Sequence, residues 1–373
     1  LPPAVQQRLL SPPAAALIAQ KGHDLPLRTY RDRDYGVAFE LPAAALEQVL
    51  HPPSVRAKFL LRHTLNFLAC LAGVGAFYTL AARRFGSWRV GLLGALLLVA
   101  SPRLFADFFY NSKDAVFLAA FTGAVATAVP FIRRPTWRGA LAHALVCALA
   151  IDVRLVGVLV PAATLAFMAV CAMRRAYPGR PVRALFGVYS VLLTGLVVVM
   201  WPFLWEAPLT NFVAAWRAMS HFRADGEVLY RGQQVSVTHL PWHYALVWIG
   251  LTVPIAYLAL WASGLASLLW AAARRRALAT TWESEWQDWL FLGLGLAPLA
   301  AVVALRSVLY NGWRQLYFVY PMLLLLALRG LVAWWQWQPL GSRGGQRYWR
   351  PALLAVVAGS VAAVGGRMVR LHP

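Results

Sequence analysis

The stretch RHTLNFLACLAGVGAFYTLAARRFGSWRVGLLGALLLVAS, residues 62–101, consists of two apolar runs separated by a short basic segment. The basic segment contains Arg83, Arg84 and Arg89. A helix that crosses a membrane needs about 20 mostly apolar residues, and tilting or snorkelling allows some latitude. Short connections that stay in the cytoplasm collect Lys and Arg. The stretch therefore predicts two membrane-crossing helices joined by a cytoplasmic turn.

Arginine clusters recur on alternate connections along the rest of the chain. The later clusters are Arg133, Arg134 and Arg138; Arg174, Arg175, Arg180 and Arg183; Arg274–Arg276; and Arg343, Arg347 and Arg350. The connections between these clusters are poorer in basic residues or carry acids as well. The positive-inside rule places the clusters in the cytoplasm and the other connections outside. We therefore expect an all-α polytopic membrane protein whose chemistry lies in its extracytoplasmic loops.

Apolar runs predict about ten transmembrane helices in this chain. Their ranges are Arg62–Ala81, Trp88–Ser101, Asp114–Ile132, Gly139–Ile151, Leu155–Met173, Ala184–Leu204, His243–Ala273, Trp289–Leu305, Leu316–Trp335 and Pro351–Gly366. The alternation places residues 1–61 outside, and a polar loop there must be exported, so we expect a further helix upstream of Leu1, with a cleaved signal peptide as the alternative. The predicted domains are a first extracytoplasmic loop with amphipathic helices at 1–61 and a transmembrane bundle at 62–373. The bundle includes an extracytoplasmic loop at 205–242, in which residues 211–220 are apolar on one face at helical spacing and predict an interfacial helix.

Composition agrees with a membrane protein and excludes several other classes. Hydrophobic residues make up 60% of the chain, charged residues only 13%, and there are 17 tryptophans. The net charge of +21 does not predict nucleic-acid binding, because the arginines flank apolar runs instead of forming one basic face. The three cysteines lie within apolar runs without metal-ligand or redox spacing. We expect the lipid bilayer as a partner, no nucleic acid and no cofactor; a divalent metal stays open, although no ligand set in the sequence supports one.

The first outer loop holds an unusual concentration of acids. Asp32, Asp34 and Glu40 lie within nine positions, although the whole chain contains only 14 acidic residues. A carboxylate at the membrane surface can act as a general base toward an acceptor hydroxyl or amine, so these three are candidate catalytic residues. The alternative is a solvated loop in which Asp and Arg side chains pair with each other.

The next outer connection passes directly into an apolar helix. Asn111, Ser112 or Asp114 can cap that helix, and its N-terminus beside Lys113 would suit a phosphate at the bilayer surface. Helix capping with a snorkelling Lys113 is the simpler alternative. Asn111, Lys113 and Asp114 are therefore candidate substrate-binding residues.

Two further outer turns carry arginines. Asp152 and Arg154 interrupt apolar sequence, where isolated charges are costly, and their spacing predicts a tight turn that leaves Arg154 free to point into a site. A purely structural turn is the alternative. Arg306 and Arg314 occupy another outer turn among aromatic residues, which suits an anionic headgroup or interfacial anchoring.

The ordered series of outer motifs resembles bacterial members of glycosyltransferase family 39, which are relatives of the protein O-mannosyltransferases and the lipid A aminoarabinose transferase. The motifs are DRDYGVAFE at 32–40, SPR at 101–103, FFYNSKD at 108–114, VLYRG at 228–232 with LPW at 240–242, and LYNGWRQLY at 309–317. The resemblance implies a GT-C fold of about eleven to thirteen transmembrane helices in the bacterial cytoplasmic (inner) membrane. Its active site would face the periplasm or cell exterior.

The resemblance also implies roles for individual residues. Asp32, Asp34 and Glu40 match the family's second acidic motif, so a further catalytic acid would lie upstream of Leu1. Lys113 and the two arginines Arg154 and Arg314 would surround the donor phosphate, and Tyr35 would contact substrate. Many relatives have a His where this chain has Gln315, which argues against acid chemistry at that position.

These features together predict an inverting glycosyltransferase. It would move a sugar from a polyprenyl-phosphate donor to a glycan, lipid or protein acceptor, with a first-loop carboxylate as base. The sequence lacks the glycine motifs that bind dinucleotides or nucleotide phosphates, as expected for a lipid-linked donor. The alternatives are a transporter or lipid flippase, in which intramembrane charges line a path, and a noncatalytic subunit of a glycan-assembly complex.

Overall fold

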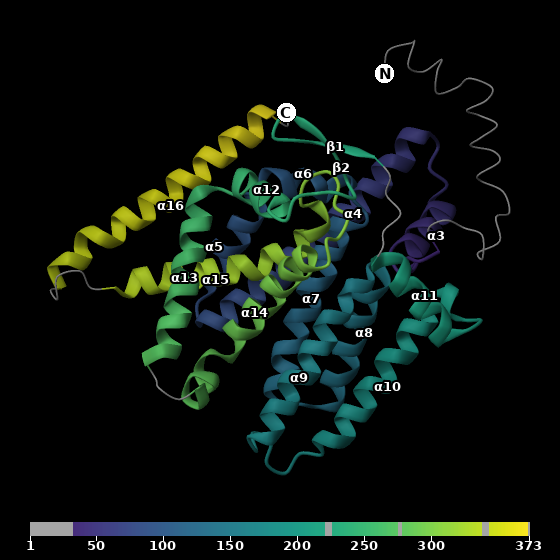
Figure 1. Ribbon diagram of the computed structural model, residues 1–373, viewed down its shortest axis with the longest axis horizontal. Coiled ribbons are helices and arrows are strands. Elements are labelled where there is room, and N and C mark those ends of the chain that lie inside the picture. The colour runs from purple at the N-terminus through teal and green to yellow at the C-terminus, as the bar shows by residue number, and fades with distance from the viewer. Residues whose placement is uncertain (1–32, 221–225, 275–277, 338–342, 372–373) are drawn as a thin grey trace.

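The computed structural model describes residues 33–220, 226–274, 278–337 and 343–371, and these residues form a bundle of α-helices (Figure 1). The predicted all-α class is confirmed for this part of the chain. Three short 3-10 helices, η1 (Leu155–Val158), η2 (Pro202–Leu204) and η3 (Arg314–Val319), and one antiparallel hairpin, β1 (Glu227–Tyr230) with β2 (Gln233–Ser236), complete the fold. The α-helices are α3 (Glu40–Leu50), α4 (Val55–Phe85), α5 (Trp88–Val99), α6 (Pro102–Tyr110), α7 (Asp114–Arg133), α8 (Trp137–Val153), α9 (Leu159–Met173), α10 (Val182–Met200), α11 (Pro208–Ser220), α12 (Tyr244–Thr252), α13 (Ile255–Arg274), α14 (Leu278–Ala304), α15 (Tyr320–Gln336) and α16 (Arg343–Leu371).

Eight helical segments among the described residues are long and apolar enough to cross a membrane. They are α4, α7, η1 with α9, α10, α13, the second part of α14, η3 with α15, and α16. The chain is thus a multi-pass membrane protein, with fewer full-length spans than the ten predicted from its apolar runs.

Two of the predicted spans form shorter helices. The run 88–101 yields α5, which has 12 residues and bends by 76° into α6, so the pair is either one broken span or a re-entrant segment. Helix α8 has 17 residues, about 25 Å at 1.5 Å per residue, which is near the lower limit for crossing a 30 Å hydrocarbon layer. Helix α12 is likewise separate from α13, because Pro254 interrupts the run predicted as one helix.

Helices α7 and α15 form the buried centre of the bundle, and the other helices pack around them. Helix α15 lies directly against α13 (Figure 1). Two glycines allow this close approach: a Cβ atom on Gly264 would lie 1.8 Å from the Leu326 carbonyl oxygen, and one on Gly330 would lie 2.1 Å from that of Leu260. Small residues at such a crossing let helix backbones touch, as is common in membrane proteins.

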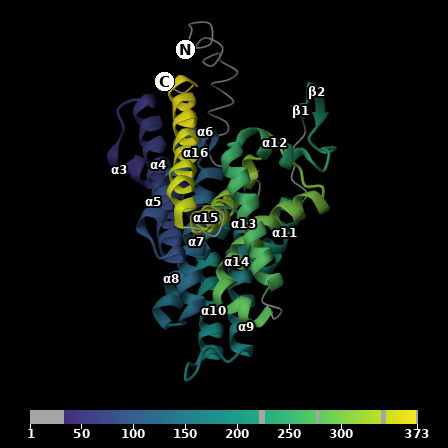
Figure 2. The ribbon, with the colours of Figure 1, turned by 90° about the vertical axis from the view of Figure 1, so that its left-hand side faces the viewer.

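The two ends of the bundle differ. We call the end that carries α3, α11 and the hairpin the loop end; the hairpin is near the top in Figures 1 and 2, and α3 and α11 are at the right in Figure 1. The opposite end, where α9 connects to α10, is called the arginine end. The Tyr177 hydroxyl donates to the Ile132 carbonyl at 2.6 Å, and Arg180 donates to the Pro135 carbonyl at 2.8 Å, so the α7–α8 connection lies there as well.

Ion pairs attach α3 to the first turns of α4. Arg62 lies 2.7 Å from a carboxylate oxygen of both Glu40 and Glu47. Its hydrogen bond to Glu47 lowers the pKa of that carboxyl below the usual value. A carboxyl whose pKa is lowered on folding contributes stability at neutral pH that is lost as the pH falls, so this attachment weakens in acid.

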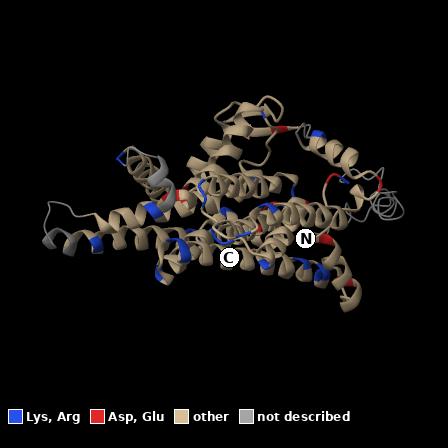
Figure 3. Cartoon of the chain, turned by 90° about the horizontal axis from the view of Figure 1, so that it is seen from below, with Lys and Arg blue, Asp and Glu red and all other residues tan. Residues whose placement is uncertain are grey.

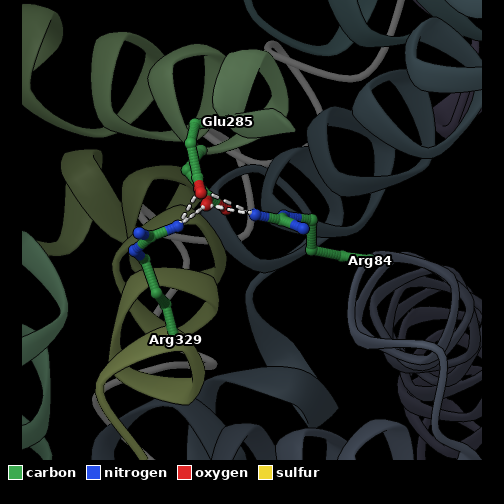
Figure 4. A network of polar contacts seen from close by, with 4 residues as sticks. Arg84, Glu285 and Arg329 are labelled. Atoms are coloured by element: carbon green, nitrogen blue, oxygen red, sulfur yellow. Dashed lines mark hydrogen bonds and ion pairs between the residues drawn. The ribbon is translucent and has the colours of Figure 1, made fainter. Parts of the chain in front are cut away.

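A buried ionic network joins three helices toward the arginine end (Figure 4). Arg84 of α4 and Arg329 of α15 both contact Glu285 and Asp288 of α14. The Arg84 Nε donates to Asp288 at 2.8 Å, and Asp288 is fully buried. Two guanidinium groups and two carboxylates balance in charge, which is the condition under which ionic groups are tolerated inside a membrane protein.

Candidate functional site

A buried carboxylate at the loop end lies between two arginines from distant connections. Asp114 is the first residue of α7, Arg154 follows the end of α8, and Arg314 begins η3. Arg154 forms an ion pair with one carboxylate oxygen of Asp114, and the Nε of Arg314 lies 2.8 Å from the other. We call these three residues the Asp114 cluster.

The Asp114 cluster carries one more positive charge than negative. The side chains of Asp114, Arg154 and Arg314 are 3%, 16% and 26% exposed. A charge removed from water is costly unless it is paired, and one carboxylate cannot neutralise two guanidinium groups. The cluster is therefore suited to receive an anion, and arginine guanidinium groups bind phosphate especially well.

The short turn before α7 fixes the position of Asp114. The side-chain oxygen of Asn111 accepts a hydrogen bond from the Asp114 backbone N–H at 2.8 Å, as a capping residue does. The side-chain amide of Asn111 then donates to the carboxylates of Asp114 and Asp107, each at 3.2 Å. Asp107 is a buried acid that the sequence analysis did not select. Its position among aromatic residues in FADFFYN was the available signal.

The first loop is bound to the turn after α8. The Gly36 N–H donates to the backbone carbonyl of Asp152 at 2.9 Å, and the Ala38 N–H donates to the Asp152 carboxylate at 2.5 Å. Asp152 thus has a structural role, which was one of the two predicted alternatives. This contact brings the loop residues Asp34 and Tyr35 toward Arg154, which lies two positions after Asp152.

Asp34 and Tyr35 occupy distinct environments in this loop. The Asp34 side chain is buried, with 6% exposure. The Tyr35 ring faces Lys113, whose ammonium nitrogen lies 3.9 Å from the ring centre, a typical cation–π distance. Lys113 precedes Asp114 directly, so the aromatic contact connects the first loop with the start of α7.

Substitution of Gly36 by Ala should detach the first loop from α8. An added Cβ would lie 1.8 Å from the carboxylate of Asp152, so that side chain must turn away or the loop must shift, and either change breaks the hydrogen bond from the Ala38 N–H. We expect faster proteolysis within residues 33–40 and loss of any activity that needs Asp34, at a cost in stability of about 1–3 kcal/mol. Gly75→Ala is the control, because a Cβ there meets nothing within 4 Å. Equal protease resistance in both variants would contradict this contact.

Arg154 of the Asp114 cluster also lines an apolar groove of about 440 Å³. Helices α11 and α14, the 3-10 helices η1 and η3, and the segment before η3 form its walls. Most of the lining is aliphatic or aromatic, while Arg154, Tyr35, Tyr310, Ser307 and Gln315 contribute the polar groups. Representative lining residues are Tyr35, Arg154, Leu155, Trp216, Pro298 and Tyr310. The groove can hold an apolar chain whose charged end reaches Arg154.

A second set of contacts joins the remaining outer motifs to this region. The Nε of Arg103 in α6 donates to the Tyr317 hydroxyl at 2.7 Å, and its Nη2 donates to the Asn311 carbonyl at 2.5 Å. The Gly312 N–H donates to the hydroxyl of Tyr244 at 3.1 Å. The motifs around 101–114, 240–244 and 309–317, which are far apart in the sequence, therefore lie together at the loop end.

The predicted site residues fall into three groups. Asn111, Arg154 and Arg314 each contact Asp114, while Tyr35 lines the adjacent groove, Lys113 contacts Tyr35, and the buried Asp34 precedes Tyr35 in the same loop. Glu40 is half exposed, and its ion pair with Arg62 joins α3 to α4. Asp32 lies outside the described residues.

Two other predictions concern features at the edge of this region. Within residues 33–220, 226–274, 278–337 and 343–371, no three His, Cys, Asp or Glu side chains are placed to share a metal ion. The predicted interfacial helix at 211–220 forms the larger part of α11, which exposes Leu209, Val213 and Trp216.

Comparison with models of known protein families, with curated proteins and with solved structures gives no match to this chain, so its function has to be argued from the site itself.

Proposed function

We propose that the protein is a membrane glycosyltransferase of GT-C type that takes a sugar from a polyprenyl-phosphate donor. The observation that carries this proposal is the apolar groove whose lining includes Arg154 and Tyr35. A polyprenyl phosphate has the matching parts, because its tail is a long hydrocarbon and its head is a phosphate. The prediction that the arginine clusters are cytoplasmic would place the site on the periplasmic or exterior side of a bacterial inner membrane.

In the proposed complex the polyprenyl tail lies in the groove and the phosphate lies beside the Asp114 cluster. Arg154 both lines the groove and belongs to the cluster, so it would contact the phosphate directly. The phosphate would add negative charge beside Arg154 and Arg314, which share the single carboxylate of Asp114. Arg314 and Lys113 would add positive charge as the leaving phosphate becomes more negative in the transition state.

Asp34 is the proposed general base. An acceptor hydroxyl or amine would attack the anomeric carbon of the sugar and give its proton to the Asp34 carboxylate. The bond from the anomeric carbon to the phosphate oxygen would break, and its electron pair would remain on the polyprenyl phosphate. Attack from the face opposite the leaving group inverts the anomeric configuration. Asp34 would later return the proton to water.

Replacement of Asp34 by Asn tests this function. We expect transfer of radiolabelled sugar from a panel of polyprenyl-phosphate donors to fall by about 10²- to 10⁴-fold, because general base catalysis contributes that much. Glu40→Gln is the matched control, since it removes a neighbouring carboxylate that pairs with Arg62. We expect donor binding by Asp34→Asn to be unchanged. Turnover at the wild-type rate in Asp34→Asn would remove Asp34 from the mechanism.

A transporter or lipid flippase is the second candidate. The ionic network of Arg84, Arg329, Glu285 and Asp288 favours it, because charged groups then occur toward both ends of the bundle. Movement of a labelled lipid across vesicles that contain the protein, with no sugar release from any donor, would favour this second function. Sugar release without lipid movement would favour the transferase.

A further inference from the structure

A second cavity lies at the arginine end, on the other side of the bundle from the Asp114 cluster. It has a volume of about 620 Å³ and lies between the last turns of α4 and α7 and the first turns of α8. Arg83, Arg133 and Arg134 line it together with Thr127 and Thr136. No Asp or Glu is among the described residues that line it.

The three arginines contrast with their neighbour Arg84. Arg84 points into the bundle and is paired with Asp288 and Glu285, whereas Arg83, one residue earlier, is exposed at the cavity. Arg133 and Arg134 are exposed as well. The cavity therefore gathers about three positive charges at one point where α4, α7 and α8 meet.

The start of α8 adds hydrogen-bond donors to this positive charge. Thr136 is the N-cap of α8, and its side-chain oxygen accepts from the Gly139 N–H at 3.1 Å, so the hydroxyl hydrogen remains available to a ligand. Helix N-termini favour anions because their first N–H groups have no partner within the helix. The donors and the arginines both indicate that an anion with several oxygen atoms would fit here.

The wall also contains an acceptor. Pro130 lies inside α7 and has no N–H to donate to the carbonyl of Ala126, four residues earlier. Both residues line the cavity. A ligand that also carries a hydroxyl group could donate a hydrogen bond to this carbonyl. The rest of the wall is apolar, including Ala142, and Trp137 beside it is exposed as interfacial tryptophans are.

We propose that this cavity binds an anionic glycerophospholipid with a hydroxylated headgroup, of the phosphatidylglycerol class, from the leaflet at the arginine end. The phosphate would contact Arg83, Arg133 and Arg134, and a headgroup hydroxyl would reach the Ala126 carbonyl. The acyl chains would extend along the apolar wall into the bilayer. Basic pockets between transmembrane helices bind anionic lipid headgroups in this way. The site is separate from the Asp114 cluster, so its occupancy does not depend on sugar transfer.

Equilibrium binding of phosphatidylglycerol with a fluorescent tail to the purified full chain in neutral detergent tests the site. The measurement is made in about 1 M salt, which shortens the Debye length to about 3 Å and suppresses the attraction of the lipid headgroup to distant charges. We expect phosphatidylglycerol to bind at least about tenfold more tightly than phosphatidylcholine with the same chains. Equal binding of the two lipids would overturn the proposal.

Two variants locate the binding in the cavity. Replacement of all three cavity arginines by Gln should weaken phosphatidylglycerol binding on the order of a hundredfold, because each arginine contributes about fivefold to the affinity. Ala142→Leu keeps every charge but places a larger side chain in the cavity, and should weaken phosphatidylglycerol binding by about tenfold. Unchanged binding in Ala142→Leu would show that the lipid binds elsewhere.

Matched controls separate this site from general surface charge and from soluble phosphate. Gln at Arg183, Arg274 and Arg350 removes three arginines from other connections, and should change binding by less than about threefold. An equal loss in this control would assign the effect to diffuse attraction. Glycerol 3-phosphate should compete only weakly because it lacks the acyl chains; competition as strong as that of the lipid would instead assign the site to a soluble phosphate.

Discussion

Asp114→Asn should reduce sugar transfer by about a hundredfold and destabilise the protein by about 3–5 kcal/mol. The substitution removes the carboxylate between Arg154 and Arg314 and leaves two guanidinium groups at a largely buried site without their shared counterion. Breaking a buried pair from one side is costly for this reason. Thermal unfolding in detergent measures the stability, and transfer from a polyprenyl-phosphate donor measures the activity.

A second substitution separates the two effects. Asp114→Asn combined with Arg314→Gln removes one acid and one base, so the excess of positive charge returns to that of the wild type. We expect this double variant to regain part of the lost stability, by a coupling of the size seen between contacting residues, about 0.5–3 kcal/mol. It should not regain activity, because Arg314 is proposed to act on the phosphate. Full stability and turnover in Asp114→Asn alone would show that the cluster has neither role.

Gly264→Ala should destabilise the contact between α13 and α15 by about 3 kcal/mol, at the upper end of the usual cost of overpacking. The added Cβ would lie 1.8 Å from the Leu326 carbonyl oxygen, and a backbone atom cannot move aside as the end of a flexible side chain can. The two helices must therefore separate or shift. Unfolding in mixed detergent micelles measures the loss.

Gly195→Ala is the control for this prediction. Gly195 lies in α10, where a Cβ meets nothing within 4 Å. Alanine favours a helix over glycine by about 1 kcal/mol, so this variant should be as stable as the wild type or slightly more so. A similar loss of stability in both variants would mean that the glycines act through helix propensity and not through the contact with α15.

The membrane class and the location of the candidate site could be predicted from the sequence because both depend on local patterns. Apolar runs and arginine clusters identify helices and connections without reference to tertiary structure. The same alternation selected the connections that carry Asn111, Asp114, Arg154 and Arg314, and the structure brings these four residues into contact.

Other features could not be predicted because they depend on contacts between distant segments. The buried position of Asp107 and the docking of Gly36 on Asp152 require knowledge of which loops meet. Fewer than ten full-length spans are found among the described residues because an apolar run does not reveal a bend: the run at 88–101 has the composition of a span but turns by 76° after α5. Glu40 was selected for its charge, and only the fold shows that its partner is Arg62.

The ionic network toward the arginine end has a consequence for the order of membrane assembly. Arg84 belongs to a helix made early, whereas its partners Glu285 and Asp288 follow about 200 residues later, and Arg329 follows them. During synthesis the Arg84 charge of α4 therefore has no counterion until α14 has been made. The two acids of α14 are in turn fully paired only when Arg329 of α15 has also been made. Chains truncated before residue 285 should be recognised by membrane quality control, because a charge without its counterion marks an incomplete bundle.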